Sequence, residues 1–525
     1  MFSPSFKSSS HCIPSPDGRL IATLHPGKID VRAVESLRTA HEVRLSPSDV
    51  PGPITSFLWS PSSLKLLVAA SDKINVFSAL DSSFRAIIQV PPPAVAKPTL
   101  VRFGPDDDVV CAFSAHGLKF SLFNLDGSTT VEINNPKFYQ PVSGPRCVSF
   151  HPRTSHLAIL TRTSGRDMIS IHAPTTWEIQ RSWYPDLIDA QGVFWAADGK
   201  WLVAWESPSQ GHKIVFYTPD GHLFRTWTGP GTAITSPELK HAELGAGIKR
   251  CQLSPDGAKI AVCDHTHFTY ILDVSNGLET RRLHHPETPI APKDTLQIWQ
   301  ENLIPAQVPP ARVAHTFAKV TQAVSPRGPS ASNGTVAEKS SGCITAVFDS
   351  SSSLLASKVE DCASAVWIWD LTATELRAVL IFSSDVASFR WHPTIPETLL
   401  ITCDGSDYQG VVFTWDPLSC GPRPLHCAQH FPDQRVASKW QASWLDSEGN
   451  PGVILVGDSN RYLLAALPES EDVIPPWGNA QPTPSVGTAT SDKLLGRTSH
   501  MDTGFVDDMD DDTTGIEDTF SFKKT

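Results

Sequence analysis

A short phrase recurs along this chain, and its recurrence restricts the possible fold more than any other feature. In "QLSPDGAKIAVCD", residues 252–264, an apolar lead-in meets a four-residue turn from Ser254 to Gly257, and an alternating run follows. Pro in the second and Gly in the fourth place of a turn favour type I geometry. Ile260 and Val262 then alternate with smaller residues, as in a half-buried strand. The phrase predicts a β-hairpin.

Eight further copies of this phrase follow a nearly regular spacing. They read "IPSPDGRLIATL", "LWSPSSLKLLVAA", "RFGPDDDVVCAF", "SFHPRTSHLAIL", "FWAADGKWLVAW", "VFDSSSSLLASK", "RWHPTIPETLLIT" and "WLDSEGNPGVILVG". Equivalent positions are Ser15, Ser60, Gly104, His151, Ala196, Ser254, Asp349, His392 and Asp446, and their spacings are 45, 44, 47, 45, 58, 95, 43 and 54 residues. A period in the forties matches one blade of a β-propeller.

A third apolar run follows each copy, and two of these runs end in the Trp-Asp dipeptide, at Trp369-Asp370 and Trp415-Asp416. This dipeptide is typical of WD-repeat blades, in which four strands form each sheet and neighbouring blades bury one another's faces. The sequence therefore predicts an all-β WD-repeat β-propeller over residues 1–467, with about nine repeat units and a diverged pattern.

The repeats leave open how the blades close. Two complete seven-bladed rings would need about 560 residues at roughly 40 per blade, more than the chain has. One large ring of eight or nine blades fits the number of copies better. The alternative is a pair of incomplete propellers that divide near residues 286–342.

Two segments interrupt the repeat. Residues 286–342 carry eight prolines and a Ser/Gly-rich run, which favours a largely irregular insert, although "ARVAHTFAKVTQAV" could hide a degenerate blade. Residues 468–525 hold twelve acidic against four basic side chains and few core-forming residues, which predicts a disordered acidic tail. Phe505, Phe520 and Phe522 are isolated among these acids and are candidate partner-binding residues.

Charge and hydropathy exclude several classes of function. The net charge is −12, of which the tail accounts for −8, so the propeller region has no basic domain suited to nucleic acid. No stretch approaches the 18 or so apolar residues of a membrane span, and the N-terminus lacks the apolar core of a signal peptide. We expect an intracellular protein whose ten cysteines are reduced.

No pattern for catalysis or cofactor binding stands out. The chain has no G-x-S-x-G, P-loop or dinucleotide-binding glycine pattern. "CDHTHF" places Cys263, His265 and His267 at alternating positions, but no second cluster completes a tetrahedral metal site. We expect no enzyme activity, no cofactor and no metal.

The fifteen tryptophans divide into two groups by their place in the repeat. Trp59, Trp195, Trp391 and Trp444 come just before the turn, where blade packing needs a large apolar side chain. Trp183 and Trp227 lie at or beyond predicted blade edges, where exposed aromatic residues often serve in partner binding.

The order in which these blade sequences follow one another resembles one particular WD-repeat family. "GVFWAADGKWLVAWES", "KIVFYTPDGHLFRTW", "GIKRCQLSPDGAKIAVCD" and "AVWIWDLTATELRAVL", with the long insert before "CITAVFDSSSSLLASK", resemble the WD repeat-containing protein 8 family over most of residues 1–467. The acidic tail and the Ser/Pro-rich insert resemble its fungal members.

The resemblance implies a function that composition and spacing do not. That family acts at centrosomes in animals and spindle pole bodies in fungi, as a non-enzymatic adaptor. It works with a coiled-coil anchoring protein, and in fungi with a minus-end-directed kinesin, to tether spindle microtubule minus ends. A translation-initiation-factor-like propeller that binds the ribosome is the alternative, although no basic stripe supports contact with RNA.

Overall fold

The computed structural model describes most of the repeat region and a short part of the tail. It covers residues 1–90, 98–114, 117–127, 129–137, 146–230, 247–286, 289–305, 313–326, 342–431, 440–445, 452–467 and 475–478, with the backbone alone at 98–99 and 519–520.

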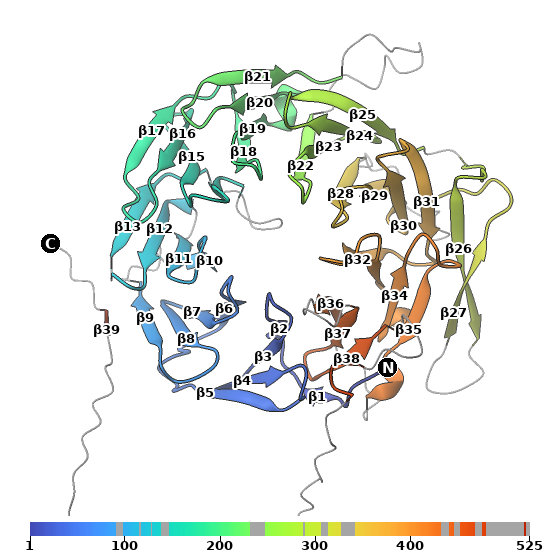
Figure 1. Ribbon diagram of the computed structural model, residues 1–525, viewed down its shortest axis with the longest axis horizontal. Helices are drawn as coiled ribbons and strands as arrows, with labels where there is room; N and C mark the ends of the chain where they lie inside the picture. Colours follow the sequence, from blue (N-terminus) through green and yellow to red (C-terminus); the bar gives the residue numbers. More distant parts are fainter. Residues whose placement is uncertain are drawn as a thin grey trace, which may run out of the picture.

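Within the described residues, nine sheets stand side by side around one axis and form a single closed ring (Figure 1). Blades 1 to 3 consist of β2 (Cys12–Pro14), β3 (Leu20–His25), β4 (Lys28–Ala33), β5 (Thr39–Arg44); β6 (Ile54–Trp59), β7 (Lys65–Ala70), β8 (Lys73–Ser78), β9 (Arg85–Gln89); β10 (Pro98–Phe103), β11 (Val109–Ser114), β12 (Lys119–Asn124) and β13 (Thr130–Asn134). Blades 4 to 6 consist of β14 (Val148–Phe150), β15 (Leu157–Thr163), β16 (Arg166–His172), β17 (Ile179–Trp183); β18 (Ala190–Trp195), β19 (Leu202–Glu206), β20 (Ile214–Tyr217), β21 (Leu223–Trp227); β22 (Ile248–Leu253), β23 (Lys259–Asp264), β24 (Phe268–Asp273) and β25 (Leu278–His284).

Blades 7 and 8 consist of β28 (Cys343–Phe348), β29 (Leu354–Val359), β30 (Ala365–Asp370), β31 (Glu375–Ile381); β32 (Val386–Trp391), β33 (Leu399–Cys403), β34 (Val411–Trp415) and β35 (Arg423–His426). Blade 9 consists of β36 (Gln441–Leu445), β37 (Val453–Gly457), β38 (Arg461–Ala466) and β1 (Phe6–Lys7). Short 3-10 turns are η4 (Pro208–Gln210), η7 (Glu360–Cys362), η8 (Ser406–Tyr408) and η9 (Ala428–His430). In this part of the chain no helix has the length and apolarity that a membrane crossing needs.

The prediction of one nine-unit propeller is confirmed, and the N-terminus closes it. β1 pairs antiparallel with β38, so that Phe6 lies opposite Tyr462. The N-terminal amino group of Met1 donates to the carbonyl of Ala466 over 2.9 Å. The first residues of the chain thus supply the fourth strand of the last blade, and the two-ring alternative does not apply.

The recurring turn is architectural, as its local geometry shows. Gly257 has a φ of +71° and donates its N–H to the Ser254 carbonyl over 2.9 Å, while the Ser254 hydroxyl accepts the N–H of Lys259. The same turn touches both neighbours, because a Cβ atom at Gly257 would lie 2.3 Å from that of Ala197, and the Ser352 hydroxyl accepts the N–H of Asp256. Each such turn therefore fixes one blade against the next.

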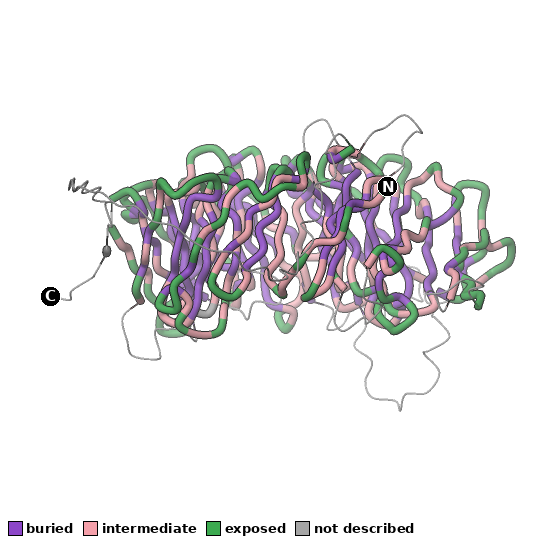
Figure 2. Tube along the Cα trace, turned by 90° about the horizontal axis from the view of Figure 1, so that it is seen from below, coloured by how far each residue is buried: buried purple, intermediate pink, exposed green. Residues whose placement is uncertain are grey.

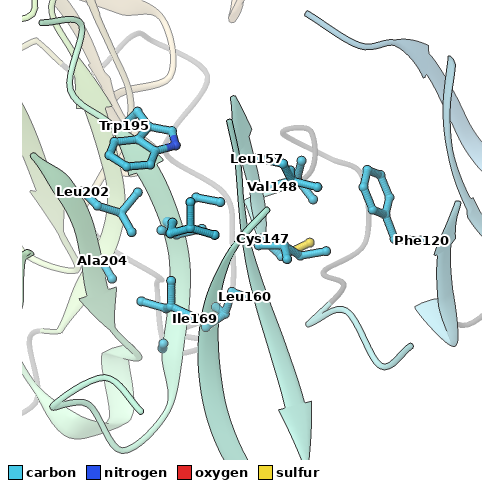
Figure 3. Packing of buried hydrophobic residues seen from close by; sticks show 14 of the residues in the cluster. Phe120, Cys147, Val148, Leu157, Leu160, Ile169, Trp195, Leu202 and Ala204 are labelled. Atoms are coloured by element: carbon cyan, nitrogen blue, oxygen red, sulfur yellow. The ribbon is translucent and has the colours of Figure 1, made fainter. Parts of the chain in front are cut away.

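The core lies between adjacent blades rather than at the centre of the ring. Seen from the side, buried strands fill the disc between two faces of exposed loops (Figure 2). In Figure 3, Trp195, Leu202 and Ala204 of blade 5 face residues of blade 4. The four tryptophans expected in the core are buried. Three of them, Trp59, Trp391 and Trp444, also donate the indole N–H to a main-chain carbonyl of the preceding blade.

The insert at 286–342 adds a hairpin to blade 7 and no further blade. β26 (Gln297–Pro305) pairs in parallel with β31, and β27 (Val313–Lys319) pairs antiparallel with β26, which makes a six-stranded sheet. The hairpin stands outside the ring, beside blades 7 and 8 (Figure 1). "VAHTFAK", where a degenerate blade seemed possible, is thus one strand of this hairpin. Residues 287–288, 306–312 and 327–341 lie outside the described part.

The segment after Leu467 differs from the expectation of a tail separate from the propeller. Trp477 is 7% exposed and packs in the seam between blades 9 and 1, with Ile21, Val34, Leu445 and Tyr462. Its large apolar surface explains why the chain returns to the ring despite the polar composition around it. Thr519 and Phe520 form β39 (Thr519–Phe520), which pairs in parallel with β9. The rest of 468–525 lies outside the described residues.

Candidate interaction surface

The polar clusters noted in the sequence serve the packing of the blades. Cys263 is fully buried, and the Nε2 atom of His267 lies 3.0 Å from the carboxylate of Asp361 in blade 7. Among the described residues, no three His, Cys, Asp or Glu side chains converge in a way that could hold a metal ion.

A chain of hydrogen bonds links three side chains of blades 6 and 7. The indole N–H of Trp369 donates to the Ser357 hydroxyl over 3.0 Å, and that hydroxyl lies 2.7 Å from Nε2 of His285. Nδ1 of His285 lies 2.9 Å from the carbonyl of His267, so Nδ1 carries the proton and Nε2 accepts. Burial lowers the pKa of His285 to about 4, which keeps the ring neutral. This arrangement gives Trp369 a structural role at the junction of blades 6 and 7.

The two tryptophans predicted at blade edges, Trp183 and Trp227, differ in how far they are buried. Trp183, at the end of β17, is half-buried, and its ring centroid lies 5.5 Å from that of Tyr217 in blade 5. Trp227 is only 6% exposed and packs against His212 and Tyr270.

The expectation that Trp227 is exposed is therefore wrong. Trp227 is the last residue of an outer strand, and this end of β21 turns inward, so its ring joins the core between blades 5 and 6. Its place at a blade edge was visible in the sequence, but the direction of its side chain was not. Phe520 is described by its backbone alone, and Phe505 and Phe522 lie outside the described residues.

Sequence reasoning missed a set of exposed apolar side chains on the rim. They occupy the first positions of the outer strands of three consecutive blades, and we call them the rim band: Ile179, Leu223, Phe224 and Leu278. Exposed arginines follow in the same strands, namely Arg181, Arg225 and Arg281. The signal in the sequence was a large apolar residue at the start of an outer strand, where five of the other six blades have a smaller or polar one.

The rim band has a stacked aromatic pair beneath it. Trp201, just before β19 in blade 5, lies flat against Phe224, with ring centroids 4.1 Å apart and planes inclined by 23°. The guanidinium of Arg225 lies 6.0 Å from the centre of the Phe224 ring. An aromatic platform flanked by cations suits the capture of a protein segment rather than chemistry on a small molecule.

A second apolar feature lies on the added hairpin. Leu303 and Ile304, near the end of β26, are both exposed. They project from the part of blade 7 that no other blade has.

Comparison with known proteins finds a similarity to a WD-repeat protein. No family model matches it. It is 26% identical over 435 residues to the mouse (Mus musculus) WD repeat-containing protein WRAP73, an alignment that covers 80% of this chain and 87% of the mouse protein.

Among solved structures, a eukaryotic initiation factor matches 81% of this chain and 90% of its own, at 10% identity and a TM-score of 0.49. The Cps50 (Swd1) β-propeller domain of Myceliophteria thermophila matches 54% of this chain and 89% of its own, at 15% identity and a TM-score of 0.32. The nine blades make this chain an all-β propeller, and along four fifths of its sequence the chain is similar to a WD-repeat protein.

Proposed function

We propose that this chain is a non-enzymatic scaffold at the spindle pole body or centrosome, where it anchors spindle microtubule minus ends together with a coiled-coil anchoring protein. The observation that carries the proposal is the similarity to mouse WRAP73, because it extends over 435 residues and is not confined to one blade. It agrees with the resemblance of the blade order to the WD repeat-containing protein 8 family.

The architecture supports a scaffold role on physical grounds. The ring is closed by its own N-terminal strand, and every blade is held to its neighbours by a buried core. Such a disc offers a wide rim and two faces of fixed shape, so binding to it orders little of the protein itself. A scaffold for several partners benefits from this rigidity. Partners would include a coiled-coil anchoring protein and, as the family resemblance implies, a minus-end-directed kinesin.

Localisation of the chain in living cells tests the proposal. We expect the fluorescently tagged endogenous protein to concentrate at spindle poles on the cytoskeleton, with a cytoplasmic pool. We expect its removal to detach spindle microtubule minus ends from the poles. Normal pole anchoring after removal would overturn the proposal.

A sucrose gradient of the same extract addresses the alternative function. If the protein sediments with ribosomal subunits and is absent from poles, the translation-factor-like reading replaces the scaffold reading. Sedimentation away from ribosomes together with pole localisation supports the scaffold.

A further inference from the structure

We propose that the rim band on blades 4 to 6 is a docking surface for an amphipathic helix whose apolar stripe is flanked by Asp and Glu residues. The inference rests on the proposed function, because it assumes that the ring holds protein partners. It adds the place on the ring and the chemistry of the segment that binds there.

The apolar side chains of the rim band are exposed on the outer strands of three consecutive blades. Ile179 is 61% exposed, Leu223 48%, Phe224 44% and Leu278 49%. Isolated exposed leucines are normal on soluble proteins, whereas grouped ones mark interaction sites. The outer strands of five other blades begin with smaller or polar residues, namely Thr39, Arg85, Thr130, Glu375 and Arg423, and that of blade 9 begins with the half-buried Phe6.

Contacts between blades make the three strands one continuous surface. The ring of Trp183, at the end of β17, leaves no room for a side chain at Gly221 in the turn before β21, since a Cβ atom there would lie 2.7 Å away. Similarly, Cδ of Arg225 in β21 would lie 2.9 Å from a Cβ atom at Gly277, next to Leu278. The outer strands β17, β21 and β25 therefore follow one another along the rim (Figure 1).

The charged side chains beside the rim band indicate which charge a binding segment would carry. The exposed Arg181, Arg225 and Arg281 form no ion pair with another described residue. Of the nearby carboxylates, Glu279 lies 3.1 Å from Arg282, and Asp220 lies 3.2 Å from the exposed His222 and also interacts electrostatically with Arg181. Two further carboxylates lie in or directly beside these strands: Glu178, just before β17, and Asp273, which is paired with Leu278 and accepts hydrogen bonds from Ser275. A segment with acidic flanks would pair with these arginines.

The spread of the rim band over three sheets favours a helix over an extended strand. An extended peptide adds to the edge of one sheet and gains its affinity from main-chain hydrogen bonds along that edge. The rim band instead offers side chains from three separate sheet edges. A helix whose apolar residues recur at i, i+3, i+4 and i+7 over several turns presents a straight apolar stripe that lengthens by about 1.5 Å per residue, with its acidic residues beside the stripe.

Site-specific photocrosslinking in cells identifies what covers the rim band. The full-length protein carries p-benzoylphenylalanine in place of Leu223 or Leu278, and in place of Leu64 as a control with matched exposure of 50% on blade 2. Mass spectrometry then maps the crosslinked peptides. We expect both rim positions, but not the control, to capture one segment that has helical apolar periodicity and flanking acids.

Every other crosslinking result overturns the inference. Yields equal to the control mean that the rim band is uncovered. Capture of a basic segment, of a second copy of this chain or of its own acidic tail means that another occupant binds there. Pole localisation of the same variants is scored in parallel. Pole localisation without rim crosslinks overturns this inference alone, whereas rim crosslinks without pole localisation overturn the proposed function alone.

The captured segment is then made as a synthetic peptide, and its affinity for variants of the protein measures how much the apolar and the basic side chains contribute to binding. We expect Leu223→Asp and Arg225→Glu each to weaken its binding at least tenfold, and higher salt to weaken binding to the unsubstituted protein. Arg44→Glu is the matched control, since Arg44 is an exposed arginine on the outer strand β5 without a described ion pair. Equal loss of binding in the control would show that only general charge matters and would overturn the inference. Thermal melting of each variant confirms that the ring remains folded.

Discussion

The imidazole of His315 lies 2.7 Å from the carboxylate of Glu301, and neither side chain is exposed to solvent. The other ring nitrogen lies 3.1 Å from the carbonyl of Asp407. The Glu301 carboxylate also accepts the hydroxyl of Tyr408 and the N–H of Ser383. These contacts fasten the β26–β27 hairpin of the insert to blade 8.

Breaking this buried pair should release the hairpin while the ring stays folded. In Glu301→Gln, His315 loses its carboxylate partner in a fully buried site, and removal of one partner of a buried pair typically costs about 3–5 kcal/mol. We expect amide hydrogen exchange to rise across 297–319 and to remain unchanged in blades 1 to 6. Thr316→Ala, on the exposed face of the same hairpin, is the control. Unchanged exchange in Glu301→Gln would show that apolar contacts alone hold the hairpin.

The repeat turns were sufficient to predict the fold, because each turn needs a left-handed or Pro-fixed residue at a set place and these residues are visible in sequence. The closure of the ring was not predictable in the same way. β1 has only two residues, in "MFSPSFKSSS", and its pairing with β38 joins positions more than 450 residues apart. A two-residue strand has no periodicity, so only the open edge of blade 9 specifies its partner.

The candidate site was predicted less well than the fold. Trp183 was chosen because it is a tryptophan at a blade edge, and the structure places it beside the rim band, where it fills the junction of blades 4 and 5. Trp227 was chosen for the same reason and is buried. Leu223 and Leu278 were passed over, because a leucine in a strand is normally a core residue and only the three-dimensional ring shows that these two point outward.

The position of Trp477 leads to a prediction about truncation. A chain that ends at Leu467 lacks this side chain in the seam between blades 9 and 1, whereas a chain that ends at Gly478 retains it. Loss of a buried tryptophan typically costs about 3–5 kcal/mol. We expect the shorter chain to unfold at a clearly lower urea concentration, and Trp477→Ala in the full chain to behave like it. Coincident unfolding of the two truncated chains would mean that the seam closes without Trp477.

Substitution of a buried tryptophan should lower the free energy of unfolding more than substitution of a half-buried one. Trp415→Ala and Trp227→Ala remove rings that are 1% and 6% exposed, so we expect each to lower the free energy of unfolding by about 3–5 kcal/mol. Trp183→Ala removes a half-buried ring and should cost less. Urea unfolding of the three variants measures the order. A Trp227→Ala variant as stable as the unsubstituted protein would contradict the packing of this ring against Tyr270.

The hydrogen-bond chain from Trp369 to His285 predicts a loss of stability in acid. Nε2 of His285 accepts the Ser357 hydroxyl, so the folded protein needs the neutral ring, and burial lowers its pKa from 6.5 to about 4. Below pH 6.5 the unfolded chain takes up a proton at this histidine while the folded chain does not, so the free energy of unfolding falls as the pH falls towards 4. Between pH 7.5 and pH 5 this one group accounts for about 2 kcal/mol, at 1.36 kcal/mol per pKa unit. We expect urea unfolding of His285→Gln to show a pH dependence shallower by that amount, whereas His222→Gln, at an exposed histidine on blade 5, should keep the full dependence. Equal pH dependence in the unsubstituted protein and His285→Gln would mean that His285 takes up its proton in the folded state as readily as in the unfolded one.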